Sequence, residues 1–304
     1  MSANLLKQAF LSDLSKNLFP DNAFYQNAKD DSAFVDNNQV NLPHAGAKPG
    51  VKVDRETKGV ASKRADSASK YPLVELSTDP TWLQYSEELL VAYNKRASIL
   101  EEHIETLNEG AADYIAAAWV KNLTSGDLIR TTGTERPVNG VAGATGNRKR
   151  LTLDDLLKIQ TKMDSDNIPQ EGRFAVITPS FKEDMLRIPE VKSSDFNKVK
   201  PLVSGSIGEF LGITFYVRSR VNVYTTGGTL REYGSETTAA TDCAGAIFWQ
   251  RDKVRKAKGA SKVFVNVDDA ELYGSKMSAL TRFGGIAARK DKKGVYALVE
   301  DNAS

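Results

Sequence analysis

The feature that most constrains this chain is a stripe of apolar residues that continues without interruption from Ser86 to about Lys121. Its members recur at steps of three and four residues, the spacing of one helix face: Leu89, Leu90, Tyr93, Ala97, Leu100, Ile104, Leu107, Ala111, Ile115 and Ala118. The opposite face is mostly acidic between Glu101 and Glu109. At 1.5 Å per residue, this pattern predicts an amphipathic helix roughly 50 Å long. An element of that length must organise the core of the fold.

The ends and the continuity of this helix are less sharply defined by the pattern. Ser86 precedes the stripe and is a suitable N-cap. Gly110 lies inside it and costs about 1 kcal/mol relative to alanine, which predicts a bend at that point. Two arrangements remain open: one helix from Ser86, or a short helix followed by a longer one from about Ala97.

The residues before the helix have a different composition. Between Asp21 and Asp79, large apolar residues are sparse, and only residues 33–42, 50–56 and 71–76 resemble strands. Such a segment does not bury enough apolar surface to offset the entropy of ordering it. It is either a solvated loop or an arm that becomes ordered on a partner subunit. Residues 5–19 before it predict a short amphipathic helix, which docks on its own domain or on a neighbouring chain.

Strands and helices alternate irregularly after the long helix, which indicates the α+β class. Thr152 is a suitable N-cap for a helix that continues to Met163, and Pro179 begins a helix over residues 180–186. Strands are predicted at residues 123–132, 173–178, 213–218, 245–249, 263–267 and 294–299.

Several classes of function are disfavoured by the residues present. The chain has one cysteine, Cys243, and two histidines, His44 and His103, which argues against a structural zinc site, a disulfide framework or a catalytic triad. The glycines of the segment from Gly140 to Gly146 lack the spacing of a nucleotide-binding loop. With 41 basic against 39 acidic residues, dedicated nucleic-acid binding is also disfavoured. We therefore expect no catalytic residue, no cofactor and no metal. Without a signal sequence or a long apolar run, a soluble cytosolic product is expected.

The order of these elements resembles the major capsid proteins of tailed bacteriophages, which share the Hong Kong 97-type fold. The phrases that carry the resemblance lie at residues 151–157, 166–169, 172–179, 204–217, 246–254, 280–284 and 294–299. The resemblance implies an N-terminal arm (residues 1–35), an extended loop (36–80) and the spine helix with the first part of a peripheral domain (81–150). An axial domain (151–260) and the closing strands of the peripheral domain (261–304) follow. The strands at 123–132, 263–267 and 294–299 are then expected in the peripheral domain.

The function implied by the resemblance is self-assembly. Copies would associate as pentamers and hexamers of an icosahedral shell, part of the virion and assembled in the host cytoplasm without a membrane. The shell would enclose double-stranded DNA without sequence-specific binding. The expected partners are a separate scaffolding protein, a portal and decoration proteins. The assembly-interface candidates are Leu6, Phe10, Lys52, Arg55, Lys63, Arg64, Ser204, Gly205, Ile207 and Gly208.

A second group of candidates is basic and is expected to face the enclosed DNA: Arg251, Lys253, Arg255 and Lys256. The competing interpretation of this run is a solvated helix face. Two other functions also remain open. One is an encapsulin-type compartment shell, which shares the fold, and the other is a cytosolic enzyme that holds a phosphate ligand on the Gly140–Gly146 loop.

Overall fold

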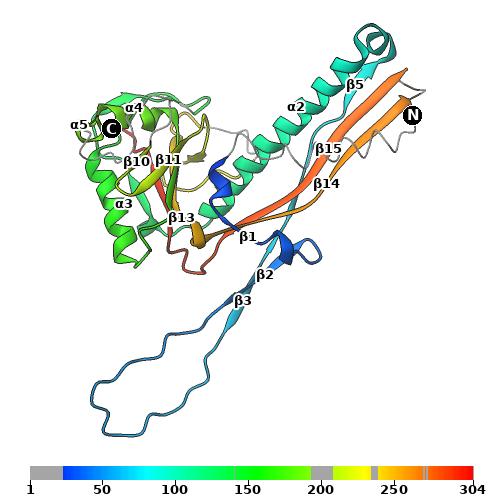
Figure 1. Cartoon of the computed structure of the whole chain (residues 1–304). Coiled ribbons are helices and arrows are strands. Elements are labelled where there is room, and N and C mark those ends of the chain that lie inside the picture. The colour runs from blue at the N-terminus through cyan, green and yellow to red at the C-terminus, as the bar shows by residue number, and fades with distance from the viewer. Residues whose placement is uncertain are drawn as a thin grey trace.

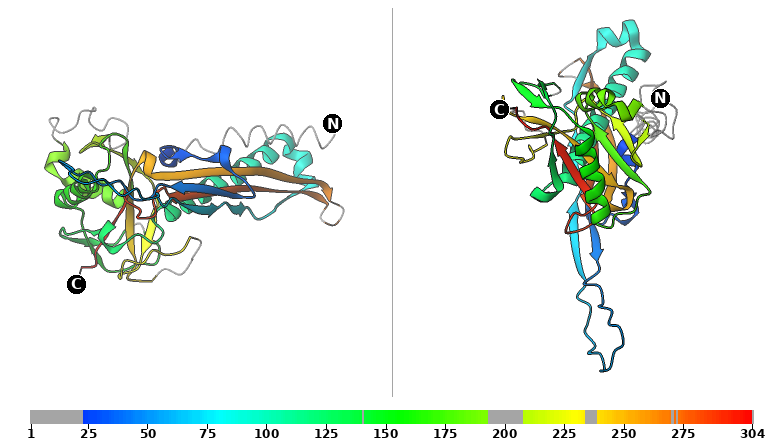
Figure 2. Two further views of the ribbon diagram at one scale, coloured as in Figure 1. Left: turned by 90° about the horizontal axis from the view of Figure 1, so that it is seen from below. Right: turned by 90° about the vertical axis from the view of Figure 1, so that its left-hand side faces the viewer.

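The computed structural model of the 304-residue chain describes residues 23–139, 141–192, 208–233, 239–269, 271 and 273–303. Three parts are visible in Figure 1: a rounded body, an elongated wing that extends from it, and a slender hairpin that projects from their junction. The C-terminus lies on the body, and Figure 2 shows the wing and the hairpin leaving the body in different directions.

The wing is a five-stranded sheet with a long helix on one face. In this sheet β1 (Lys29–Asp30) runs parallel to β14 (Val254–Asp269), which pairs along its length with antiparallel β15 (Gly274–Ala287). On its other edge, β15 pairs with both β4 (Val74–Ser77) and β5 (Thr81–Gln84). The two long strands, β14 and β15, run beneath the long helix.

That helix, α2, runs without a break from Tyr85 to Val120, so the structure has the first of the two arrangements left open, a single helix. Its N-cap is Gln84, so the expected cap at Ser86 is wrong. Leu100, Ile104 and Leu107 are buried against Val263 of β14 and Ala279 of β15. Nearer the body, the buried positions of α2 are Ala111, Ala112, Ile115, Ala116 and Trp119. The buried side of the helix widens here because it enters the body as well as lying on the sheet.

The body is built on a seven-stranded mixed sheet with the order β10-β11-β9-β13-β16-β6, and β12 pairs with β13. Its strands are β6 (Leu128–Arg130), β9 (Arg173–Ile177), β10 (Glu209–Phe210), β11 (Ile213–Val217), β12 (Asn222–Tyr224), β13 (Cys243–Gln250) and β16 (Val295–Val299). The central strands β13 and β16 are buried at every position. This sheet therefore forms the middle layer of the body.

Helices and short elements complete the body and the base of the hairpin. They are α3 (Leu153–Ser165), α4 (Pro179–Arg187), α5 (Pro189–Lys192), the small hairpin of β7 (Glu135–Pro137) and β8 (Asn147–Lys149), and the 3-10 turns η1 (Ala23–Gln26), η2 (Ser32–Phe34), η3 (Ser125–Asp127) and η4 (Arg251–Lys253). Thr152 caps α3 in a capping box with Asp155, and Pro179 opens α4, as the sequence predicts. Among the described residues, no helix is long and apolar enough to cross a membrane.

The two faces of the body sheet bury different cores. One core contains α3 and α4 residues such as Leu156, Ile159 and Phe181. The other is aromatic and joins the body to the wing, with the rings of Trp119 and Trp249 only 5.3 Å apart. Burying each large apolar side chain contributes about 1.5–3 kcal/mol. The second core therefore fixes the wing rigidly on the body.

Three strands that were expected together do not share one sheet. The strand predicted at residues 263–267 is part of β14 in the wing, whereas the strands predicted at 123–132 and 294–299 correspond to β6 and β16 in the body sheet. These strands therefore belong to two different sheets. The expected boundary at residue 260 also falls inside β14, which begins at Val254. The reason is non-local: β16 pairs with β13 and β6 across the body sheet.

The projecting hairpin consists of β2 (Gln39–His44) and β3 (Ser67–Pro72), paired antiparallel. Between them, residues 45–66 form neither helix nor strand, so the strand predicted at residues 50–56 is absent. We call residues 45–66 the extended loop. It leads away from both sheets and makes the lower end of the molecule in Figure 1.

Candidate assembly surfaces

The extended loop places apolar side chains in solvent. Val51, Val53 and Val60 are 94%, 85% and 96% exposed. A single two-stranded hairpin is marginally stable in water unless it packs on another surface. Val51 and Val53 alternate with charged residues in the sequence, which is the pattern of a strand with one apolar face. The sequence prediction singled out the basic residues here and missed these valines.

Four of the predicted interface residues lie on the same loop: Lys52, Arg55, Lys63 and Arg64 are all exposed. Arg64 forms an ion pair of 2.6 Å with Asp66, whose other contact is the backbone amide of Gly46 on the opposite side of the loop. That amide donates to the Asp66 carboxylate at 2.9 Å. The loop therefore offers both charge and apolar area to a partner.

The base of the hairpin is held firmly by the wing. Val40, Tyr71 and Leu73 are buried together with Ala257 of β14. The Tyr71 hydroxyl donates to Asp31 at 3.1 Å. These contacts fix the direction in which the extended loop leaves the molecule.

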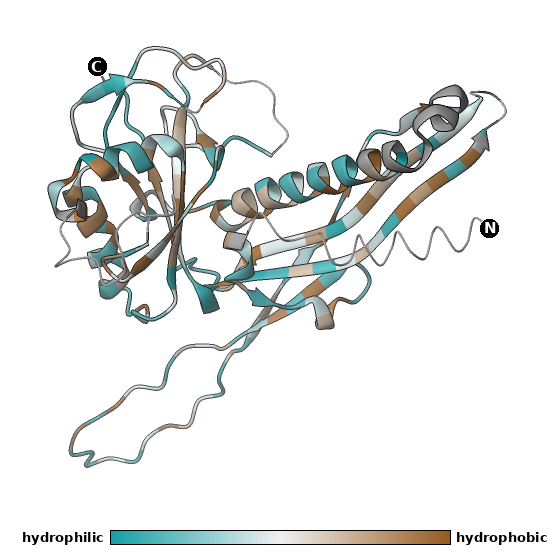
Figure 3. Ribbon diagram, turned by 45° about the horizontal axis from the view of Figure 1, so that its top comes forward, coloured by the Kyte–Doolittle hydropathy of each residue, from teal (hydrophilic) through white to brown (hydrophobic). Residues whose placement is uncertain are grey.

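The outer face of α2 is a second candidate surface. Glu101, Glu102, Glu105 and Glu109 are exposed and follow one another along the helix. Figure 3 shows hydrophilic positions recurring along α2 in this region. Beside them lies a groove of about 570 Å³ between α2, β4 and Tyr233. Like charges at this spacing repel one another on an isolated helix, so the face is suited to a basic partner.

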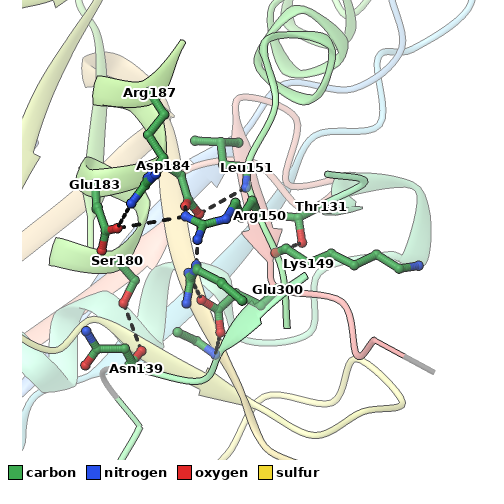
Figure 4. A network of polar contacts seen from close by, with 12 residues as sticks. Thr131, Asn139, Lys149, Arg150, Leu151, Ser180, Glu183, Asp184, Arg187 and Glu300 are labelled. Atoms are coloured by element: carbon green, nitrogen blue, oxygen red, sulfur yellow. Dashed lines mark hydrogen bonds and ion pairs between the residues drawn. The ribbon is translucent and has the colours of Figure 1, made fainter. Parts of the chain in front are cut away.

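A buried ionic network holds the body together (Figure 4). Asp184 of α4 accepts hydrogen bonds from Arg136 at 3.1 Å, from Arg150 at 2.9 Å and from the backbone amide of Leu151 at 3.1 Å. Arg136 also donates to Glu300, which is fully buried after β16. Burial raises the pKa of Glu300, and Arg136 opposes this by lowering it. All the donors are occupied by protein, so the network is structural.

Five predicted interface residues lie outside the described part of the chain: Leu6, Phe10, Ser204, Gly205 and Ile207. A sixth, Gly208, is half-buried immediately before β10. No contact described for Gly208 assigns it a role at an interface. The assembly role of all six stays a prediction.

The four basic residues expected to face DNA do not lie on an α-helix: Arg251 and Lys253 are in the 3-10 turn η4, and Arg255 and Lys256 are in strand β14. Arg251 is exposed, and Arg255 forms an ion pair of 2.8 Å with Asp31. Lys256 lies 5.6 Å from the centre of the Tyr25 ring, and burial lowers its pKa. Because successive strand residues point to opposite faces, Arg255 and Lys256 do not present one surface. The competing interpretation of one solvated helix face does not fit Arg255 and Lys256, which are in β14. The role of all four residues in facing DNA stays a prediction.

Groups suited to catalysis are not assembled by the part of the chain that the structure describes. It contains no cluster of three or more His, Cys, Asp or Glu residues able to hold a metal ion. Burial raises the pKa of the Cys243 thiol, which keeps it protonated and unreactive. His103 lies buried on α2, far from the thiol in the sequence.

Comparison with known families matches residues 65–298 to a family described as phage capsid protein. The match spans α2, both sheets and the long strands of the wing. No curated protein sequence matches the chain significantly.

Solved structures with the same fold come from phage particles. The capsid of cyanophage P-SCSP1u has 17% identity and a TM-score of 0.60, covering 91% of this chain and 86% of that chain. A chain from Mycobacterium phage Che8 has 16% identity and a TM-score of 0.54, covering 93% and 89%. The mature capsid of bacteriophage PhiM1 has 10% identity and a TM-score of 0.58, covering 90% and 86%. The Hong Kong 97-type fold expected from the sequence is confirmed.

Proposed function

Since this chain belongs to the phage capsid protein family, we propose that its copies assemble as hexamers and pentamers of an icosahedral head shell. It is a structural protein of the virion and not an enzyme. Closed symmetric assembly lets many modest contacts sum to a stable particle. Of the functions left open by the sequence, the family match selects the phage capsid over a compartment shell or an enzyme.

The observation that carries this proposal is the extended loop. It projects from a rigid base, exposes Val51, Val53 and Val60, and has no core of its own. In the shell, this loop lies on an adjacent subunit, which buries the valines and orders the loop on binding. The acidic outer face of α2 is complementary in charge to the six lysine and arginine residues of the extended loop.

The remaining partners belong to the same proposal. A separate scaffolding protein guides assembly, a portal occupies one vertex, and decoration proteins bind the outside. The shell encloses double-stranded DNA without reading its sequence. With nearly balanced charge over the whole chain, containment needs only weak, salt-dependent contacts with the phosphates.

Electron microscopy of the purified chain, with and without the proposed scaffolding protein, tests this function. Shells or capsomers of six and five subunits are expected. Replacing the three exposed valines with serine should abolish shells while leaving the unassembled subunit folded by circular dichroism. The control replaces the same valines with isoleucine and should assemble. A chain that stays monomeric with its scaffold present would contradict the proposal, as would normal shells from the serine variant.

A further inference from the structure

A cavity of about 400 Å³ lies at the base of the projecting hairpin, where three parts of the fold meet. His44 ends β2 and Ser67 begins β3, so both strands of the hairpin contribute to its wall. Lys253 comes from the junction of β13 and β14, and Arg289 and Lys290 come from the turn after β15. The cavity therefore touches the hairpin, the wing and the body at once.

The charges around this cavity are unequally compensated. The Arg289 guanidinium donates two hydrogen bonds to Asp291, at 2.7 and 2.6 Å, and Arg255 is paired with Asp31. The ammonium of Lys290 donates instead to the neutral hydroxyl of Ser67 at 2.8 Å.

Lys253 and Lys290 are the cations that remain without a carboxylate. Within the described residues, neither ammonium forms an ion pair, although Asp252 also lines the cavity. The stem of Lys253 packs closely on the turn at Gly294, which holds this side chain beside the cavity. Two cations are thus directed to one cavity by packing and by a hydroxyl contact.

The pKa of His44 is lowered, in part by the positive charges near its ring. Burial lowers its pKa, and Lys290, Arg289 and Arg255 lower it further. The nearby carboxylates are Asp252 and Asp291, which also line the cavity, and Asp31, which pairs with Arg255. Its Nε2 lies 2.5 Å from the Ser69 hydroxyl, which fixes the ring at the wall. A positive potential in a concave site concentrates anions.

We propose that this cavity binds a phosphate group, held between Lys253 and Lys290 with Arg289 and His44 at its walls. Phosphate oxygens accept several charge-assisted hydrogen bonds at once, and such bonds are about twice as strong as neutral ones. The group comes either from inorganic phosphate or pyrophosphate in solution, or from the backbone of DNA. A bound phosphate ties the hairpin strands to the turn after β15 and stiffens the extended loop at its base.

The site requires only the single folded chain, so its test does not depend on shell formation. Isothermal titration of the unassembled subunit with pyrophosphate is the first arm. Fluorescence anisotropy with a short DNA duplex over a range of salt concentrations is the second. Lys253→Gln with Lys290→Gln removes both unpaired cations while keeping polar, unbranched side chains at the two positions. Lys48→Gln with Lys58→Gln is the matched control, because it removes two exposed lysines of the extended loop.

Saturable pyrophosphate binding, weakened at least tenfold by the cavity variant and within twofold of normal in the control, is the expected result for free phosphate. If DNA supplies the group, the cavity variant instead lowers the slope of log affinity against log salt by about one to two. The proposal is overturned if the subunit binds neither probe at millimolar concentration, or if both variants weaken binding equally. Matching unfolding curves for the two variants exclude loss of the fold as the cause.

Discussion

Arg136 lies between the fully buried carboxylates of Asp184 and Glu300 and forms ion pairs with both. Its guanidinium donates to Asp184 and to Glu300, which are 48 and 164 residues away in the sequence. Asp184 has Arg150 and a backbone amide as further partners, whereas Glu300 has one further partner, the amide of Ala244. Removing the arginine therefore leaves Glu300 the worse compensated.

Arg136→Met should lower the free energy of unfolding by about 3–5 kcal/mol, the cost of leaving a buried charge unpaired. Urea unfolding of the unassembled subunit measures this loss. Lys149→Met on the neighbouring strand is the matched control, because its ion pair with Asp301 is about one-third exposed on both sides. Such pairs contribute about 0–1 kcal/mol. Equal losses in the two variants would show that burial of the network does not matter.

Asp242 gives a prediction that depends on pH. Burial by itself raises the pKa of this carboxyl, but hydrogen bonds from Arg231 and the amide of Ala239 hold it below its usual value. A lowered folded-state pKa means that the carboxylate stabilises the fold above its unfolded pKa of about 3.9. That contribution is lost as the pH falls through the folded pKa.

Asp242→Asn should therefore cost about 1–3 kcal/mol near neutral pH, and the penalty should shrink as the pH falls below about 4. Unfolding curves of both proteins from pH 7 to pH 3 measure the difference. In an Arg231→Gln background the same substitution should cost less and vary less with pH. A penalty that stays constant over the whole range would rule out the assigned role of Arg231.

At the scale of secondary-structure elements, the close crossing of α2 over β15 depends on Gly285. A Cβ atom at Gly285 would lie 2.7 Å from Cγ1 of Ile115 on α2 and 3.1 Å from the carbonyl oxygen of Arg255 on β14. The helix and the sheet approach this closely because that atom is missing. The aromatic core that joins wing and body lies beside this crossing.

Gly285→Ala should cost about 1–3 kcal/mol, because a well-packed interior does not accept an added carbon without strain. The strain is expected to fall when Ile115 is shortened, although Ile115→Ala alone costs about 2–5 kcal/mol. A double-mutant cycle by urea unfolding should therefore give a favourable coupling of at least about 0.5 kcal/mol. Purely additive losses would place the strain on the Arg255 backbone instead.

Local signals explain which elements were predictable. Thr152 and Asp155 define the start of α3 within four residues, and the apolar stripe defines α2. By contrast, β14 was only recognised over residues 263–267, because its first half is rich in lysine and lacks alternating apolar residues. Its pairing with β15 supplies the stability that its own sequence lacks. The membership of β16 in the body sheet was missed for a similar reason, since its partners β13 and β6 are distant in the chain.

Candidate sites divide in the same way. The extended loop was predictable from the shortage of large apolar residues in residues 45–66. The cavity at the hairpin base was not, because His44, Lys253 and Lys290 come together only when three distant segments fold. The basic turn after β15 was visible in the sequence, but nothing local indicated what it faces.

At the scale of the whole molecule, we expect the extended loop to become ordered only through contact with another subunit. The body and the wing share an aromatic core, to which no residue of the extended loop belongs. Six of its residues are lysine or arginine, and they are exposed in the single subunit. A protease that cleaves after basic residues therefore has its best substrate here, since exposed loops without packed side chains open most readily.

Trypsin should cleave the unassembled subunit first between Lys48 and Arg64, as mass spectrometry of the early fragments would show. The two fragments should stay together, because β2 and β3 remain anchored to the wing through Tyr71 and Ala257. In assembled shells, the same sites should be cut at least tenfold more slowly if a neighbouring subunit covers the loop as proposed. The exposed turn at Lys290 serves as an internal reference on the same chain. If cleavage of the loop proceeds equally fast in subunits and shells, the loop does not form the contact between subunits.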